Sequence, residues 1–148
     1  MSDKVFVITL NWNGVKYILD CLQSVERLIH PVEEIVVVDN GSTDNSINEI
    51  KDKFPSVKII ENGSNLGYSL GFNIGIEYSM SNDADFILIM NNDTIIDKHA
   101  LDELLKTIKK GDDIGFVSGK VLEHKNPNII QTVGRKSHSL NLVSDSHV

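Results

Sequence analysis

The sequence predicts an α/β fold in which a mostly parallel sheet is flanked by helices. Short apolar runs of strand length alternate with longer segments whose apolar residues recur at helical spacing. The runs are rich in valine and isoleucine on both faces, which is typical of strands that helices cover on both sides. Because polar turn residues follow the runs, we expect the chain to be built from repeated strand–helix units.

Two such units are predicted at the start of the chain. The first strand is expected at residues 5–10, and the helix after it extends to Pro31, which cannot continue a helix. The second strand covers residues 35–38. The helix after that strand is predicted to begin at an N-cap residue, either Thr43 or Asp44, and to stop at the next proline.

Three further strands are predicted downstream. Residues 57–61 and 86–90 are apolar runs, and each ends in a cluster of turn residues. A helix with inward leucines is expected to begin at Asp97 and to close at Gly111. Residues 114–121 are interpreted as a fifth strand.

Residues 68–80 give conflicting signals. Their apolar residues alternate strictly, which favours a strand. Gly71, Asn73 and Gly75 are poor strand residues, however. On a helix the two glycines would share one face and would let the backbone approach a sheet or a ligand. The alternation of strands and helices along the chain favours a helix.

Size and charge limit the function classes. A length of 148 residues predicts one domain, and the net charge of −7 argues against nucleic acid or an anionic membrane as a partner. The single cysteine excludes an internal disulfide and a multi-cysteine metal site. We expect a cytoplasmic protein, because no signal-peptide pattern and no apolar run of about 20 residues is present.

Asparagine and aspartate follow four consecutive predicted strands. Each of them is an ordinary turn former by itself. Because the carboxyl ends of parallel strands meet at one edge of a sheet, four such clusters favour a polar ligand over turn formation alone. The residues are Asn11 and Asn13, Asp39 and Asn40, Asn62 and Asn65, and Asn91, Asn92 and Asp93.

The absence or presence of known motifs limits which classes of polar ligand this edge could bind. The chain has neither a P-loop nor a G-x-G-x-x-G turn after its first strand, which argues against P-loop hydrolases and dinucleotide dehydrogenases. Carboxylates and amides can neutralise a diphosphate through a divalent cation, which Asp93 is suited to hold. Asp39 is suited to bind a base or a ribose.

The same stretches resemble the family 2 glycosyltransferases, whose nucleotide-binding half has the Rossmann-like GT-A fold. They occur in the family's order over about residues 4–135, and they look most like the rhamnosyltransferase-like branch that builds bacterial surface polysaccharides. The matching stretches are I-T-L-N-W-N-G at 8–14, V-V-V-D-N-G-S-T-D at 36–44, N-L-G at 65–67 with G-F-N-I-G at 71–75, and M-N-N-D-T at 90–94.

The resemblance implies a nucleotide-sugar donor, either a UDP-, dTDP- or GDP-sugar. Thr9, Asn11 and Asp39 would contact its nucleoside. The other donor-binding residues implied are Asn13, Ser42, Asn65, Gly67, Asn73, Asn92 and Asp93.

Residues 91–93 stand at the D-x-D position of the family. The resemblance implies that Asp93, with Asn91, binds Mn²⁺ or Mg²⁺ and bridges it to the diphosphate. Many members have aspartate where Asn91 stands, and an amide is a weaker metal ligand. The resemblance also favours the helix at residues 68–80.

Family members usually extend well past 148 residues, and their later part supplies the acceptor site. That part also carries a carboxylate general base, which deprotonates the acceptor hydroxyl in an inverting transfer. Asp145 and Glu123 are poor candidates, so we expect the base beyond Val148. The chain is thus expected to be an apparently truncated donor-binding domain that is inactive alone, with a saccharide or lipid-linked saccharide as acceptor. Contact with the inner face of a membrane would come only through the missing part or partners.

Two alternatives belong to other classes. One is a non-catalytic nucleotide-binding or assembly module that keeps only the fold, which a turnover assay of the full-length protein would separate from a transferase. The other is a sugar nucleotidyltransferase. It is less favoured, because its glycine-rich basic loop is missing after Leu10.

Overall fold

The computed structural model describes residues 3–133. The chain divides into two compact units, one that ends at Asp102 and one that begins at Glu103. Helix α4 (Ala100–Ile108) crosses this boundary. The expectation of one domain over residues 1–148 stays a prediction. No helix in the described range is long and apolar enough to span a membrane.

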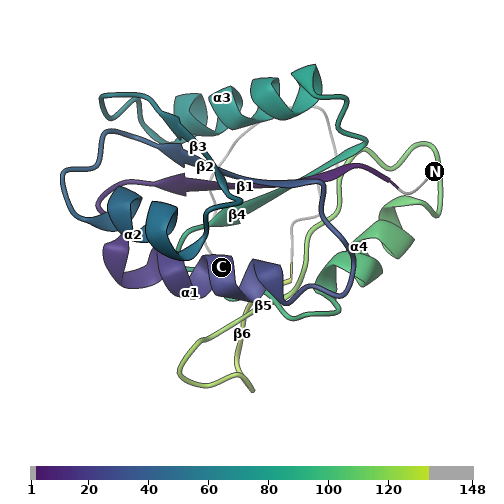
Figure 1. Cartoon of the computed structure of the whole chain (residues 1–148). Helices are drawn as coiled ribbons and strands as arrows, with labels where there is room; N and C mark the ends of the chain where they lie inside the picture. The colour runs from purple at the N-terminus through teal and green to yellow at the C-terminus, as the bar shows by residue number, and fades with distance from the viewer. Residues whose placement is uncertain (1–2, 134–148) are drawn as a thin grey trace. The chain divides into compact units, whose positions relative to one another are not determined.

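The first unit is built on a four-stranded parallel sheet with the strand order β3-β2-β1-β4 (Figure 1). The strands are β1 (Val5–Asn11), β2 (Glu34–Asp39), β3 (Lys58–Glu61) and β4 (Phe86–Asn91). The helices that connect them are α1 (Val15–Glu26), α2 (Ser46–Lys53) and α3 (Tyr68–Ser81).

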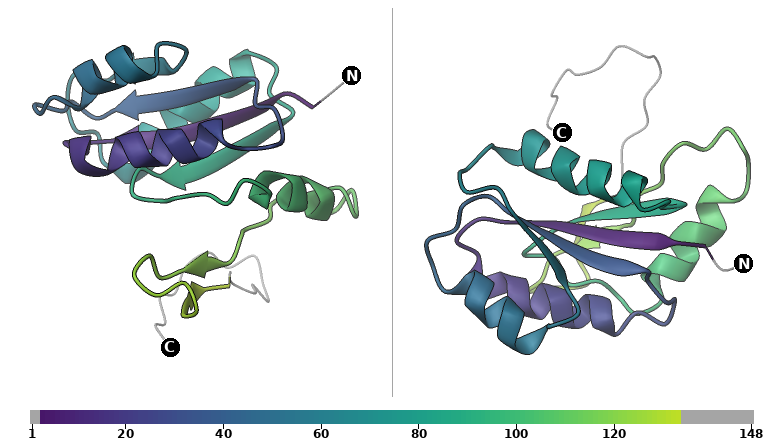
Figure 2. Two further views of the ribbon diagram at one scale, coloured as in Figure 1. Left: turned by 60° about the horizontal axis from the view of Figure 1, so that its bottom comes forward. Right: turned by 45° about the horizontal axis from the view of Figure 1, so that its top comes forward.

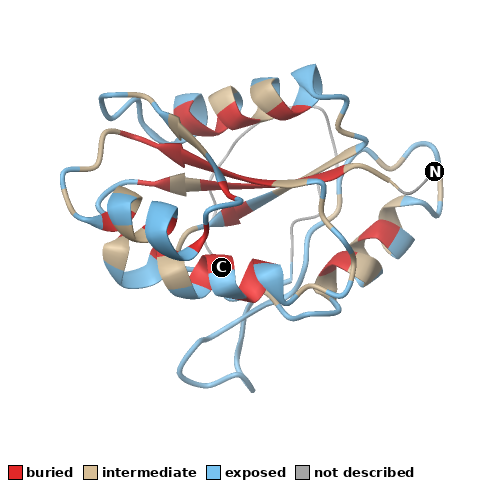
Figure 3. Cartoon of the chain, viewed as in Figure 1, coloured by how far each residue is buried: buried red, intermediate tan, exposed pale blue. Residues whose placement is uncertain are grey.

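Helices α1 and α2 cover one face of the sheet and α3 covers the other, as the views in Figure 2 show. Because side chains alternate along a strand, β1 and β2 supply both halves of the core. The half under α1 and α2 contains Val7, Ile18, Leu22, Val37 and Ile50. The half under α3 contains Phe6, Ile8, Val36, Val38 and Phe72. The two central strands are buried almost throughout, which confirms the two-sided burial predicted for them (Figure 3).

Helix α3 resolves the conflict at residues 68–80 in favour of a helix. Its two glycines lie against the sheet. A Cβ at Gly71 would be 2.4 Å from Leu10 Cδ1, and one at Gly75 would be 2.6 Å from Ile8 Cγ2. The strict alternation of apolar residues therefore does not reflect a strand, because Gly71 and Gly75 meet the sheet together with Phe72, at helical spacing.

The predicted fifth strand at residues 114–121 is wrong. The second unit instead contains a short antiparallel pair, β5 (Val121–Leu122) and β6 (Ile130–Thr132). Two glycines weaken the strand propensity of the predicted segment, and Phe116 within it is 82% exposed. Without a buried face, the apolar residues of this segment gain little from an extended conformation.

The helix boundaries differ from the predictions by a few residues. Helix α1 ends at Glu26 and not at Pro31, and Ile29 beyond it is 55% exposed, so the helix has no buried face to extend. Helix α2 begins at Ser46 rather than directly after Thr43 or Asp44, and its N-cap Asn45 makes no side-chain capping bond. Asp44 still accepts a hydrogen bond from the Ser46 amide at 3.0 Å. Helix α4 begins three residues after Asp97, whose carboxylate accepts a bond from the His99 amide at 2.8 Å, and it ends before Gly111.

Candidate functional site

The polar residues that follow the four strands of the first unit meet at one edge of the sheet, as predicted. Asn11 is paired with Asp39 across β1 and β2, and Asp39 is paired with Glu61 across β2 and β3. On the other side of β1, Leu10 is paired with Asn91. The carboxyl edge of the sheet therefore joins the turns after β1, β2, β3 and β4, and we take it as the candidate site.

A buried hydrogen-bonded group lies at this edge on the side of α1 and α2. Asn11 Nδ2 donates to Asp39 Oδ1 at 2.9 Å and lies 2.8 Å from Ser46 Oγ. Ser42 donates its hydroxyl to Asp39 Oδ1 at 2.5 Å and its amide to Oδ2 at 2.9 Å. Both oxygens of Asp39 therefore accept hydrogen bonds from the chain itself, and the residue is only 3% exposed. We call these four residues the Asn11–Asp39 cluster.

The turns after β1 and β2 are tied to each other. Asn13 adopts a left-handed backbone with φ of 49°, and its Oδ1 accepts a bond from the Thr43 amide at 2.7 Å. Asp44 Oδ2 accepts a bond from the Val15 amide at 3.0 Å. Burial alone would raise the pKa of Asp44, but hydrogen bonds from Ser46 and from Val15 outweigh it and lower this pKa. These bonds fix the first turn of α1 against the turn after β2.

A second group lies at the same edge on the side of α3, and we call it the Asn40 cluster. Asn40 Nδ2 donates to the Gly67 carbonyl at 3.0 Å and lies 3.4 Å from Asn65 Oδ1. Asn62 Nδ2 donates to Asn40 Oδ1 at 2.8 Å. Asn40 was predicted among the polar residues at the strand ends, but no donor-binding role was assigned to it. The signal that could have identified it is strand alternation, which points residue 40 to the face opposite Asp39.

The turn at residues 91–93 is held from both sides of the sheet. Asn92 Nδ2 donates to Asn11 Oδ1 at 3.3 Å, and Tyr68 donates its hydroxyl to Asn91 Oδ1 at 3.0 Å. Asp93 is exposed. Within residues 3–133, no three carboxylate, histidine or cysteine side chains gather to form a metal site. Asp93 is therefore a single carboxylate presented beside two amide groups.

Two predicted donor-binding residues do not join this network. Thr9 is 1% exposed, and strand alternation places it on the side of α1, beneath Asn11. Its hydroxyl interacts only weakly, with the buried Cys21 thiol, among the described residues. Asn73 is exposed in the middle of α3. Their predicted roles at the donor stay predictions.

Trp12 is an exposed aromatic residue that the prediction did not include. It follows Asn11 directly, at the end of β1, and 56% of it is exposed. An indole left in water at a polar turn is unusual for a residue that normally buries much of its surface. Its exposed face is available to a planar ligand.

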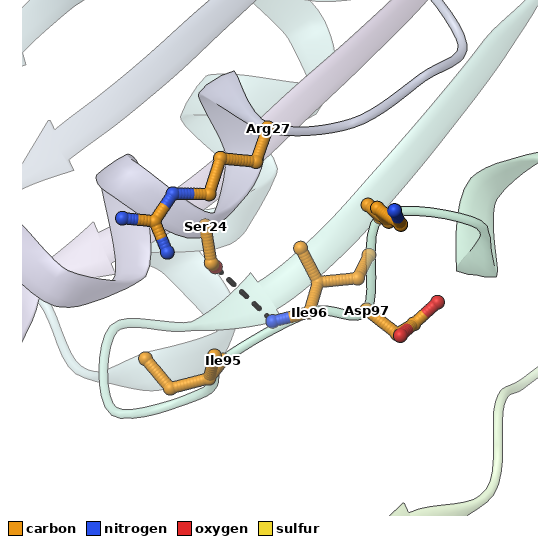
Figure 4. A pocket seen from close by; sticks show the side chains of 6 residues that line it. Ser24, Arg27, Ile95, Ile96 and Asp97 are labelled. Atoms are coloured by element: carbon orange, nitrogen blue, oxygen red, sulfur yellow. Dashed lines mark hydrogen bonds between the residues drawn. The ribbon is translucent and has the colours of Figure 1, made fainter.

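A cavity of about 420 Å³ lies at the opposite end of α1 (Figure 4). It is lined by Ser24, Arg27, Ile95, Ile96, Asp97 and Lys98. None of the predicted site residues lines it. The residues predicted for the site therefore lie at the carboxyl edge of the sheet and not around this cavity.

The chain matches the family described as glycosyl transferase family 2 over residues 5–139. It is 28% identical over 116 residues to glycosyltransferase GlyG of Streptococcus pneumoniae serotype 4, covering 76% of this chain and 37% of that protein. It is 26% identical over 113 residues to N-acetylglucosaminyl-diphospho-decaprenol L-rhamnosyltransferase of Mycobacterium tuberculosis, covering 71% of this chain and 37% of that protein.

A solved structure of similar fold is S. aureus TarS 1-349 in complex with UDP-GlcNAc. The TM-score is 0.64 at 26% identity, covering 72% of this chain and 31% of that chain. The likeness confirms the predicted GT-A fold. The chain spans between about a quarter and two fifths of the length of the first curated relatives it matches. Because the family match extends over most of its residues, the chain belongs to glycosyl transferase family 2.

Proposed function

We propose that the carboxyl edge of the sheet is the donor site of a glycosyltransferase. It binds a nucleotide-diphosphate sugar, whose sugar is transferred with inversion to a saccharide or lipid-linked saccharide acceptor. The observation that carries the proposal is the convergence of the Asn11–Asp39 cluster, the Asn40 cluster and the turn at residues 91–93 in a member of this family. The UDP-GlcNAc complex of TarS supports a nucleotide sugar as the ligand class.

The nucleoside would lie against the turns after β1, β2 and β3. Asn13, Asn65 and Trp12 are exposed there, so they offer amide hydrogen bonds and one aromatic face. A base can stack on an exposed aromatic ring, with about 1–3 kcal/mol of binding free energy per base. In this proposal Asp39 and Asn11 form the rigid wall of the site, because their polar atoms already bond to the chain.

The diphosphate would lie near Asp93. We propose that Asp93, together with Asn91, holds Mg²⁺ or Mn²⁺ against the phosphate oxygens. One carboxylate is a sufficient protein anchor, because such cations are usually bound by one or two carboxylates plus phosphate and water. When bound, the cation neutralises the leaving diphosphate. No residue of this chain is proposed as the general base.

The donor site can be tested by thermal unfolding of the chain with UDP-, dTDP- and GDP-sugars, with and without Mn²⁺. A ligand that binds only the folded state raises the unfolding free energy, and with it the midpoint, by an amount that grows with the logarithm of its concentration over its Kd. We expect at least one nucleotide sugar to stabilise the chain, and Mn²⁺ to enlarge that shift.

The Asp93→Ala variant should lose the part of the shift that depends on Mn²⁺. Asp20→Ala, which removes an exposed aspartate from α1, is the matched control and should keep it. If no nucleotide sugar stabilises the chain at millimolar concentration, the donor-site proposal fails. If Asp93→Ala and Asp20→Ala behave alike, only the metal assignment fails.

A further inference from the structure

Tyr68 connects the start of α3 to the end of β4 across the candidate site. Its hydroxyl donates to Asn91 Oδ1 at 3.0 Å, although the two residues are 23 positions apart in the sequence. Tyr68 is the first residue of α3, and Asn91 is the last residue of β4. The contact therefore joins the helix on one face of the sheet to the turn that carries Asp93.

The ring of Tyr68 packs against another aromatic residue of α3. It packs edge-to-face on Phe72 with a centroid distance of 4.7 Å and an interplanar angle of 61°. Phe72 lies in the core under α3. Tyr68 is nevertheless 62% exposed, so burial alone does not explain a tyrosine at this position. Phe72 thus contacts the ring, while the hydroxyl of Tyr68 bonds to Asn91 in the turn.

The side-chain amides of Asn91 and Asn92 form hydrogen bonds on opposite sides of the sheet. Asn92 donates to Asn11 on the side of α1, while Asn91 accepts from Tyr68 on the side of α3. A side-chain amide oxygen has two lone pairs, so Asn91 Oδ1 can accept one hydrogen bond and still ligate a cation. The bond from Tyr68 orients the second lone pair.

We propose that Tyr68 is a positioning residue for the metal ligands of the donor site. The inference rests on the proposed function. An amide is a weak ligand for a divalent cation, and a freely rotating exposed asparagine must also be ordered when the cation binds. Tyr68 holds Asn91 in one orientation beforehand, so that Asn91 Oδ1 and the Asp93 carboxylate meet the cation together.

The test is Mn²⁺ affinity measured by electron paramagnetic resonance, which counts free Mn²⁺, with UDP, dTDP or GDP at saturation. We expect Tyr68→Phe to weaken Mn²⁺ binding about twofold to tenfold, the range that one hydrogen bond supports. We expect Asn91→Ala to weaken it by at least as much. Adding Tyr68→Phe to Asn91→Ala should cause no further loss, because Tyr68 acts through Asn91.

Tyr17→Phe is the matched control, because Tyr17 is an exposed tyrosine on α1, a different helix from the one that carries Tyr68. Its Mn²⁺ affinity should equal that of the wild type. Nucleotide affinity without metal should be the same in Tyr68→Phe and wild type, which separates a role at the metal from a loss of folding.

Unchanged or tighter Mn²⁺ binding in Tyr68→Phe overturns the inference, since the hydroxyl would then be idle or competing with the cation. Equal losses from Tyr68→Phe in the presence and absence of Asn91 also overturn it. If the wild type binds none of the three nucleotides, the proposed function fails before Tyr68 is tested, so the two failures are distinguishable.

Discussion

Asn11 and Asp39, at the paired ends of β1 and β2, share a buried hydrogen bond of 2.9 Å. Both residues are almost fully buried although they lie at the end of the sheet. A buried carboxylate is costly unless its oxygens are hydrogen-bonded, and here both oxygens are. The pair therefore sets the shape of the site and contributes to the stability of the first unit.

Asp39→Asn should lower the free energy of unfolding by about 1–3 kcal/mol, the cost of a buried polar group that loses its partner. The new amide would present hydrogen atoms to Asn11 Nδ2 or to the Ser42 amide, which are themselves donors. Urea unfolding measures the difference. Asp93→Asn makes the same chemical change at an exposed carboxylate and should stay within about 0.5 kcal/mol of wild type. Equal costs for the two variants would contradict the structural role of Asp39.

Gly75→Ala should destabilise the fold by about 1–3 kcal/mol, the typical cost of overpacking a core. The added methyl group would be 2.6 Å from Ile8 Cγ2 and 3.0 Å from Val38 Cγ2, which both belong to central strands. Asn73→Ala on the exposed side of α3 is the control, and it should not destabilise the chain. Thermal or urea unfolding compares them. A stability gain in Gly75→Ala would mean that α3 packs less closely on the sheet.

Asp44 should make stability depend on pH in the acid range. Hydrogen bonds to its carboxylate hold the pKa of Asp44 below the ordinary value of 3.8, despite the opposing effect of burial. A lowered folded-state pKa stabilises the fold above the unfolded-state pKa, and this contribution is lost as pH falls through the folded-state pKa. Asp44→Asn should therefore be less stable than wild type at pH 7, and the difference should shrink toward pH 3. Urea unfolding at pH 7, 4 and 3 measures it. A constant difference would contradict the pKa shift.

Cys21 should be unreactive in the folded protein. It is fully buried under the sheet, and burial raises the pKa of its thiol to about 11. Since the thiolate is the reactive form, a thiol reagent at pH 8 should react only after unfolding. Spectrophotometric assay of thiol reaction in native buffer and in urea tests this. Similar rates in the two conditions would show that α1 opens without global unfolding.

The order of elements in the first unit could be predicted from local signals. Two-sided apolar runs identified β1 and β2, and a proline marked the end of α2, whereas α1 already ends at Glu26. The convergence of polar turns could also be predicted, because it follows from parallel strands alone. The same signals were insufficient for residues 114–121, of which only Val121 pairs with another strand in the described part of the chain. Strand formation depends on such partners and not on composition.

The contacts within the site could not be predicted in the same way. The resemblance assigned Thr9 and Asp39 to the nucleoside, and those roles stay predictions. The burial of Thr9 and the bonds from the chain to the Asp39 carboxylate were not predicted. The bond between Tyr68 and Asn91 joins elements that the sequence does not show to be neighbours. Which polar atoms of a turn remain available to a ligand depends on such long-range hydrogen bonds. The residue pattern of one strand carries no information about these bonds.

The location of the ligand is tested most directly by backbone amide NMR of this 16.5 kDa chain during titration with UDP-, dTDP- and GDP-sugars in the presence of Mg²⁺. The donor-site proposal predicts that the amides that shift are those at residues 11–14, 40–46, 65–68 and 91–93. The cavity lined by Arg27 and Lys98 lies at the other end of α1 and serves as an internal reference whose amides should not shift. Shifts confined to that cavity, or none with any of the nucleotides, would contradict a donor site at the carboxyl edge of the sheet.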